Sequence, residues 1–145
     1  MFFDPRQGLP PLLVIAALVG CGGPNVGTSS GLTCVDDSPH CIERRQQTLS
    51  YLVDSNDRAW IKAHPPAEAY ASGVRLFALQ RKKKELTCEE LAHGRHEAEK
   101  GPGILRGPEG AKLTPAQVSR GAILASEVSR ELAAEIERRC KNKKT

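Results

Sequence analysis

The segment from Glu90 to Glu97 holds the side chains whose types and spacing come closest to a chemical site. His93 and His96 lie three positions apart, with Glu90 three positions before His93 and Glu97 four positions after it. Residues three, four and seven apart share one face of a helix. Two imidazoles and a carboxylate on such a face could hold a divalent metal ion. Gly94 separates the histidines and no fourth ligand is evident, so metal binding is the alternative prediction.

No other group of side chains in the sequence is arranged like an active site. The serines fall in expected helix caps, in a Gly/Ser-rich segment or on helix faces, and no phosphate-binding glycine loop is present. Acidic residues are spread among basic ones rather than paired. We therefore expect a protein that is not an enzyme and that has no cofactor.

The first 21 residues contain the long apolar run of the chain, from Leu12 to Val19, followed by Gly20 and Cys21. This run is shorter than the roughly 20 residues that span a bilayer as a helix, and it has the length of a secretion leader. The stretch Leu18-Val19-Gly20-Cys21 resembles the lipobox of bacterial lipoprotein precursors. The resemblance covers residues 1–21 alone and implies that residues 1–20 are removed as a signal peptide.

The same resemblance implies that Cys21 carries acyl chains such as palmitate and holds the protein to a membrane, facing the periplasm. Two or more chains anchor stably, at about 0.8 kcal/mol per buried methylene. Gly22, where an Asp could stand, resembles lipoproteins that are sorted to the outer membrane. Residues 22–33 are rich in Gly and Ser and predict a flexible tether before a helical domain at 34–145.

The chain has five cysteines. If Cys21 is acylated, the remaining four form an even set, which outside the cytoplasm indicates two disulfides. Three connectivities are open, and we favour the one whose first pair is close along the chain. No pair has the short spacing of a zinc knuckle. The predicted disulfide residues are Cys34 with Cys41 and Cys88 with Cys140.

Three start signals and a helical spacing of apolar residues predict an all-α fold, a small irregular bundle of three to four helices with two disulfides. Ser38-Pro39 has the form of a cap followed by a first-turn proline, and Thr87 to Glu90 and Thr114 to Gln117 have the form of capping boxes. Trp60 is expected to fill the core. The expected helices are 39–54, 66–84, 88–100 and 115–140.

The segment 101–113, GPGILRGPEGAKL, is rich in Gly and Pro and predicts the longest loop of the domain. Long loops often bind partners, so this segment is the predicted contact surface. The net charge of +4 is too small to indicate nucleic-acid binding. The basic clusters 81–84 and 141–144 are expected to complement helix dipoles, with an anionic envelope polymer as their functional alternative.

The predicted function is that of a lipid-anchored, non-catalytic helical envelope protein, which binds an envelope protein or an anionic envelope polymer. The alternative is a small periplasmic protein that binds a divalent metal through His93 and His96.

Overall fold

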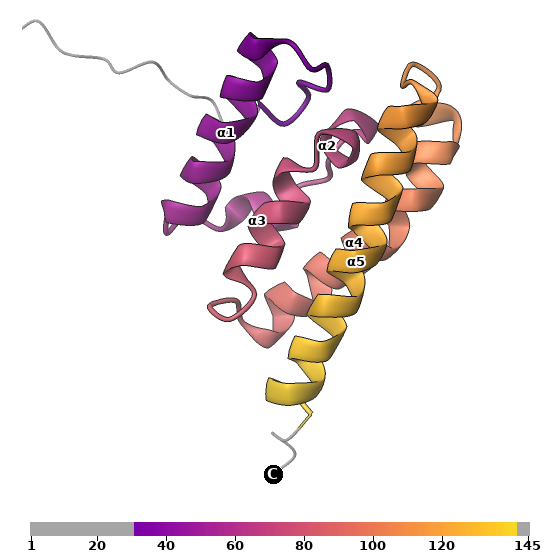
Figure 1. Cartoon of the computed structure of the whole chain (residues 1–145). Helices are drawn as coiled ribbons and strands as arrows, with labels where there is room; N and C mark the ends of the chain where they lie inside the picture. Colours follow the sequence, from indigo (N-terminus) through magenta and orange to yellow (C-terminus); the bar gives the residue numbers. More distant parts are fainter. Residues whose placement is uncertain (1–30, 142–145) are drawn as a thin grey trace, which may run out of the picture.

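The computed structural model describes residues 31–141, and the predicted signal peptide, Cys21 and most of the predicted tether lie outside the described residues. All regular structure in the described part is helical, which confirms the all-α prediction (Figure 1). Five α-helices and two short 3-10 turns follow one another along the chain. They are α1 (Pro39–Asp54), η1 (Ala59–Lys62), α2 (Ala67–Ser72), α3 (Val74–Lys82), α4 (Cys88–Arg106), η2 (Pro108–Gly110) and α5 (Pro115–Arg139).

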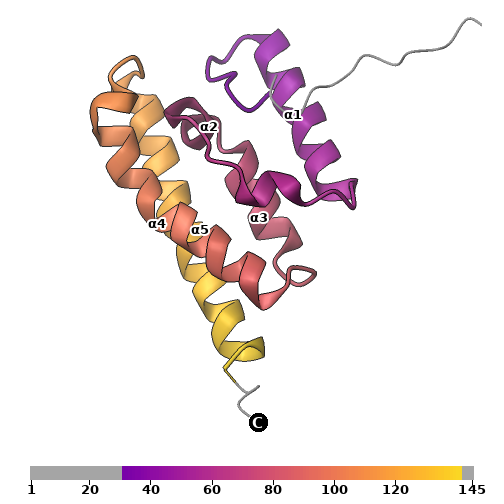
Figure 2. The ribbon, with the colours of Figure 1, turned by 180° about the vertical axis from the view of Figure 1, so that it is seen from behind.

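The two longest helices, α4 and α5, run antiparallel side by side and form the largest helix contact of the domain (Figures 1 and 2). The shorter helices α2 and α3 pack against this pair. Helix α1 lies on the far side of α3 from α5 and packs mainly on α3. The bundle therefore has two unequal halves. The thick half is the α4–α5 pair with α2 and α3 packed against it, and the thin half is α1 alone.

The core is aliphatic, with contributions from every helix and from η1. Each such side chain contributes about 1.5–3 kcal/mol when it is fully buried. Trp60 is 8% exposed and belongs to this core, as expected. The largest fully buried apolar side chains are Leu52, Ile61, Leu76, Leu79, Leu86, Leu91, Leu105, Val128 and Leu132.

The three predicted helix starts are confirmed by their hydrogen bonds. The Ser38 hydroxyl accepts the Cys41 backbone N–H at 3.2 Å. Thr87 and Glu90 form a complete capping box, and Thr114 forms another with Gln117. Such caps each stabilise a helix by about 1 kcal/mol, so the sequence signals mark the starts of α1, α4 and α5.

The single helix expected over 66–84 is in fact two helices, because Gly73 ends α2 in a left-handed conformation with φ of 76°. Side chains with a Cβ rarely adopt this conformation. Helix α3 begins at once, and the Phe77 N–H donates to the Gly73 carbonyl at 2.9 Å. This break is why the described residues hold five helices rather than three or four.

The loop expected over 101–113 is a second correction, since α4 continues through Gly101 and Pro102 to Arg106. A Cβ on Gly101 would lie 2.9 Å from the Cβ of Ala125, so the glycine lets α4 approach α5 closely. Packing against α5 thus outweighs the low helix propensity of glycine and proline. The segment proposed as a contact loop is mostly helix.

The tether expected over 22–33 is shorter than predicted at its carboxyl end. Residues 31–33 form a turn, and Gly31 is buried against Thr48 of α1. Residues 31–33 therefore pack with the helical domain in the part of the chain that the structure describes.

Candidate functional site

The four cysteines of the domain pair as favoured from the sequence. Cys34 is joined to Cys41, with Cα atoms 5.4 Å apart, and Cys88 to Cys140, with Cα atoms 5.8 Å apart. The first disulfide closes a short loop at the start of α1. The second links the start of α4 to the end of α5, at the end of the pair opposite η2.

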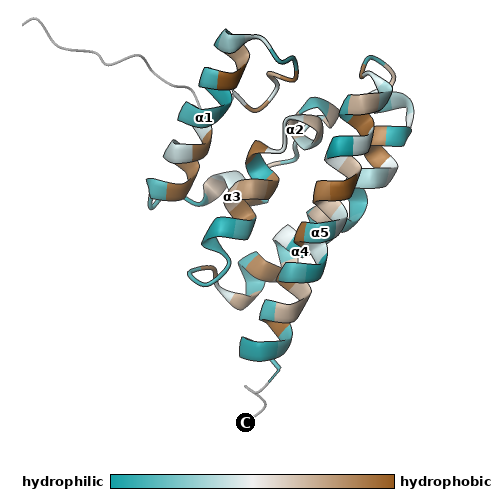
Figure 3. Cartoon of the chain, viewed as in Figure 1, coloured by the Kyte–Doolittle hydropathy of each residue, from teal (hydrophilic) through white to brown (hydrophobic). Residues whose placement is uncertain are grey.

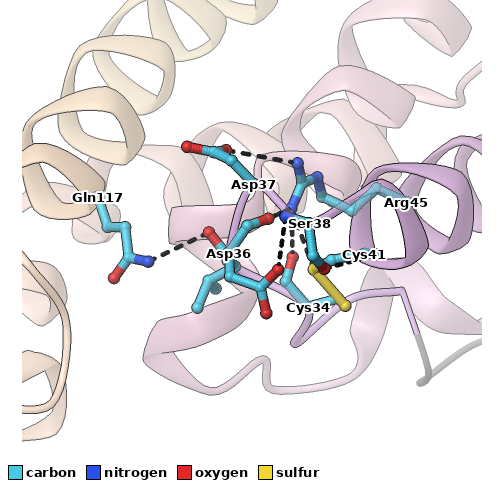
Figure 4. The surroundings of a disulfide bond; sticks show 8 residues. Cys34, Asp36, Asp37, Ser38, Cys41, Arg45 and Gln117 are labelled. Atoms are coloured by element: carbon cyan, nitrogen blue, oxygen red, sulfur yellow. Dashed lines mark hydrogen bonds and ion pairs between the residues drawn. A yellow bond between two sulfur atoms is a disulfide. The ribbon is translucent and has the colours of Figure 1, made fainter.

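The guanidinium of Arg45 organises the corner around the first disulfide (Figure 4). Its Nη1 donates to the backbone carbonyls of Cys34, at 2.9 Å, and Asp36, at 2.6 Å. From α5, the side-chain amide of Gln117 donates to the Val35 carbonyl at 3.2 Å. The segment before α1 is thereby held against both α1 and α5.

An apolar groove lies between α1, α3 and α5, and consists of two adjoining hollows of about 230 Å³ each. The two hollows share Arg45, Ser72 and Phe77. Hydrophobic stretches of ribbon occur on all three helices (Figure 3). The other lining residues include Ile42, Leu49, Val74, Gly121 and Leu124.

The groove exposes large apolar side chains and is lined by two arginines, both of which pair with the neighbouring Asp37. Phe77 of α3 is 42% exposed, and Ile42 of α1 is 39% exposed. The charged lining residues are Arg45 and Arg120, with no carboxylate among the described lining residues. Nearby Asp37 lies 3.3 Å from Nη1 of Arg120. Exposed apolar surface next to guanidinium groups suits a partner with apolar and acidic side chains.

A second, polar pocket of about 240 Å³ lies between α4, α2 and the segment before α2. It brings His93 and His96 together with a third imidazole, His64, which sequence spacing did not suggest. Its polar lining residues are His64, Tyr70, His93, His96, Glu97, Lys100 and Glu109.

The two glutamates expected beside the histidines are engaged elsewhere. Glu90 completes the α4 capping box and also pairs with Arg58 at 3.0 Å. Glu97 pairs with Arg75. Within the described part of the chain, no three His, Cys, Asp or Glu side chains are grouped so as to hold a metal ion. Metal binding through His93 and His96 stays a prediction.

Glu97, which lines the polar pocket, forms a buried ion pair with Arg75 of α3. Arg75 Nε lies 2.9 Å from one carboxylate oxygen of Glu97, and its Nη2 lies 2.6 Å from the other. The side chains are 3% and 7% exposed. Arg75 also donates to the carbonyls of Trp60 and Ala63 and lies 5.6 Å from the Trp60 ring centroid. This pair fixes η1 onto α3 and α4.

Tyr70 of α2 lines the same pocket and is almost fully buried. Burial raises the pKa of its phenol to about 12, and the nearby carboxylate of Glu97 acts in the same direction. The hydroxyl therefore keeps its proton at neutral pH and can donate a hydrogen bond. Nothing in the sequence around Tyr70 indicates this polar role.

The basic cluster 81–84 is partly structural. Lys82 is buried, and its ammonium donates to the Val53 carbonyl at 2.7 Å. Lys83 pairs with Glu131 of α5 at 2.6 Å. Arg81 and Lys84 remain exposed. Most of the second cluster, 141–144, lies outside the described residues.

Comparison of the chain with protein-family models, curated proteins and solved structures found no match. Among the helices described here, none has both the length and the apolar character needed to cross a membrane.

Proposed function

We propose that this chain is the precursor of a lipid-anchored, non-catalytic helical protein of the bacterial envelope, held to the outer membrane through Cys21 and facing the periplasm. Two observations support the anchor. The stretch before Cys21 resembles a lipobox, and the other four cysteines are used in disulfides within the domain. Disulfides persist in oxidising compartments such as the periplasm.

The anchored domain binds a protein partner in the groove between α1, α3 and α5. The observation that supports this proposal is the exposure of Phe77. This large aromatic side chain lines the groove and is 42% exposed. The partner segment is amphipathic, with an apolar side chain that covers Phe77 and a carboxylate that meets the more exposed Arg120. Aromatic and arginine side chains are the usual binding hot spots.

The mass of the native protein tests the anchor. We expect a chain that begins at Cys21 and carries acyl chains, and that gains four hydrogens on reduction of its two disulfides. A Cys21→Ser variant should lose membrane attachment, whereas a Ser29→Ala variant in the same segment should keep it. A native Cys21 with no added mass contradicts the proposal.

Crosslinking in the host, with two matched variants, tests the groove. Phe77→Lys should weaken capture of a specific partner by about 30-fold, as expected for a hot spot. Ile123→Lys changes a side chain that is 69% exposed and does not line the groove, so it should leave capture unchanged. Equal capture by both variants would exclude the groove.

Two alternatives have separate tests. If Arg81 and Lys84 bind an anionic polymer, binding of the protein to anionic vesicles should fall steeply with salt and with loss of these two charges. If His93 and His96 hold a metal, calorimetric titration with zinc, copper or nickel should release or absorb heat. Flat traces for all three metals would exclude the second alternative.

A further inference from the structure

The polar pocket on the α4 side of the domain is separate from the apolar groove, which is built from α1, α3 and α5. Its lining residues come from α4, from α2 and the segment before it, and from η2. We call it the imidazole pocket, defined by His64, Tyr70, His93, His96, Glu97, Lys100 and Glu109. Neither the proposed anchor nor the groove uses it.

Hydrogen-bond donors dominate the imidazole pocket. The Lys100 ammonium, the three imidazoles and the phenol of Tyr70 can all donate. Both Glu97 oxygens already accept from Arg75, so this carboxylate is neutralised by its partner. Glu109 is the one remaining carboxylate in the lining, at the η2 end.

We propose that the imidazole pocket binds a small organic anion, a carboxylate or a phosphate ester. The anionic oxygens lie among Lys100, His93 and His96 and accept the Tyr70 hydroxyl proton in a hydrogen bond. The rest of the ligand packs on Pro65 and Ile104, which also line the pocket. The volume of about 240 Å³ corresponds to roughly eight water molecules at liquid density, so the ligand is small.

The titratable groups that face the anion are His64 before α2, Tyr70 of α2, Glu109 of η2, and the side chains of α4, with Arg75 of α3 beneath them. Each unit positive charge about 4 Å from an anionic oxygen, such as the Lys100 ammonium, should tighten binding by about fivefold in water-like surroundings. The α4 groups are His93, His96, Glu97 and Lys100.

Ring NMR signals of the histidines test this proposal on the purified native protein in detergent. Sodium sulfate, a dianion at neutral pH, and sodium lactate, a monoanion, are titrated at neutral pH against sodium chloride of equal ionic strength. We expect saturable shifts of the His93 and His96 signals with both anions, because both residues line the pocket.

Three variants separate anion binding from a general effect on the fold. Lys100→Gln should weaken sulfate binding by about fivefold, and Glu109→Gln should strengthen it by about fivefold, because one removes attraction and the other repulsion. His40→Gln changes an exposed histidine in α1, outside the pocket, and should change nothing.

The opposite responses of the Lys100 and Glu109 variants, with no response of the His40 variant, support the proposal. It is overturned if neither anion gives a saturable shift up to roughly 50 mM, or if Lys100→Gln and Glu109→Gln change affinity in the same direction. The proposal is also overturned if zinc binds saturably and neither sulfate nor lactate binds. That result would support metal binding by the same histidines.

Discussion

The α4–α5 pair and helix α1 are held in the bundle in different ways. Helices α4 and α5 bury a continuous stripe against each other and are joined by a disulfide that spans 52 residues. Helix α1 packs mainly on α3, and its own disulfide spans 7 residues. A bridge across a long loop removes more freedom from the unfolded chain than a bridge across a short one.

The α4–α5 pair is the stable scaffold, and the surface that can bind a partner lies beside α1. The residues of α5 that face α4, among them Ala125 and Leu132, are fully buried, whereas α1 leaves Ile42 and Leu49 partly open beside Phe77. Binding surfaces are often drawn from the less stable parts of a fold. The thin half of the bundle supplies one wall of the groove, and the thick half keeps the groove in shape.

Removal of the two disulfides should give the largest difference between the halves. On the loop-entropy model, replacing Cys88 and Cys140 with serine lowers the free energy of unfolding by about 4 kcal/mol, and replacing Cys34 and Cys41 lowers it by about 2.5 kcal/mol. Urea denaturation of both double variants measures these changes. A larger loss from the Cys34 and Cys41 pair would show that α1 contributes more to stability than its packing indicates.

Cavity-creating substitutions should give the next largest difference. Leu132→Ala removes a fully buried side chain of α5 and should lower the free energy of unfolding by about 3 kcal/mol. Leu49→Ala removes a half-buried side chain of α1 and should lower it by about 1 kcal/mol. Thermal unfolding by calorimetry compares the two, and equal losses would contradict the division into a thick and a thin half.

Lowering the pH should weaken the contact between α3 and α5, with a smaller loss of stability than the substitutions above. Hydrogen bonds from Lys83 and Gln80 hold the pKa of the Glu131 carboxyl below its usual value. A carboxyl with a lowered pKa stabilises the fold above its unfolded pKa, and this contribution is lost as the pH falls through the folded value. We expect the urea midpoint to fall below about pH 4.3.

The Glu131→Gln variant should show a flatter dependence of the urea midpoint on pH in that range. Glu127→Gln, which changes an exposed glutamate one turn earlier on α5, serves as the matched control. If both variants keep the full slope, another carboxyl is responsible for the acid sensitivity.

Local signals in the sequence predicted the starts of the helices well because caps act within four residues. The Ser38, Thr87 and Thr114 caps all form as expected. The two errors within the helical region lie at Gly73 and Gly101, where tertiary contacts determine whether the helix continues. Gly73 was expected to continue a helix and ends one, and Gly101 was expected to end a helix and continues one.

The candidate sites were only partly predictable. The spacing of His93 and His96 placed them on one face, but their neighbour His64 comes from a segment almost 30 residues earlier, and no local pattern links them. The groove depends on how α1, α3 and α5 meet, which periodicity does not specify. The one local clue to the ion pair was Arg75, a charge between Val74 and Leu76 in an otherwise apolar run.

The position of Trp60 also determines what a fluorescence experiment on this protein would report. It is the single tryptophan of the chain, and its indole lies at the junction of η1 with α3, below the Arg75 guanidinium. Its emission would change when that junction opens to water. An optical unfolding curve would therefore report the opening of the junction between η1 and α3.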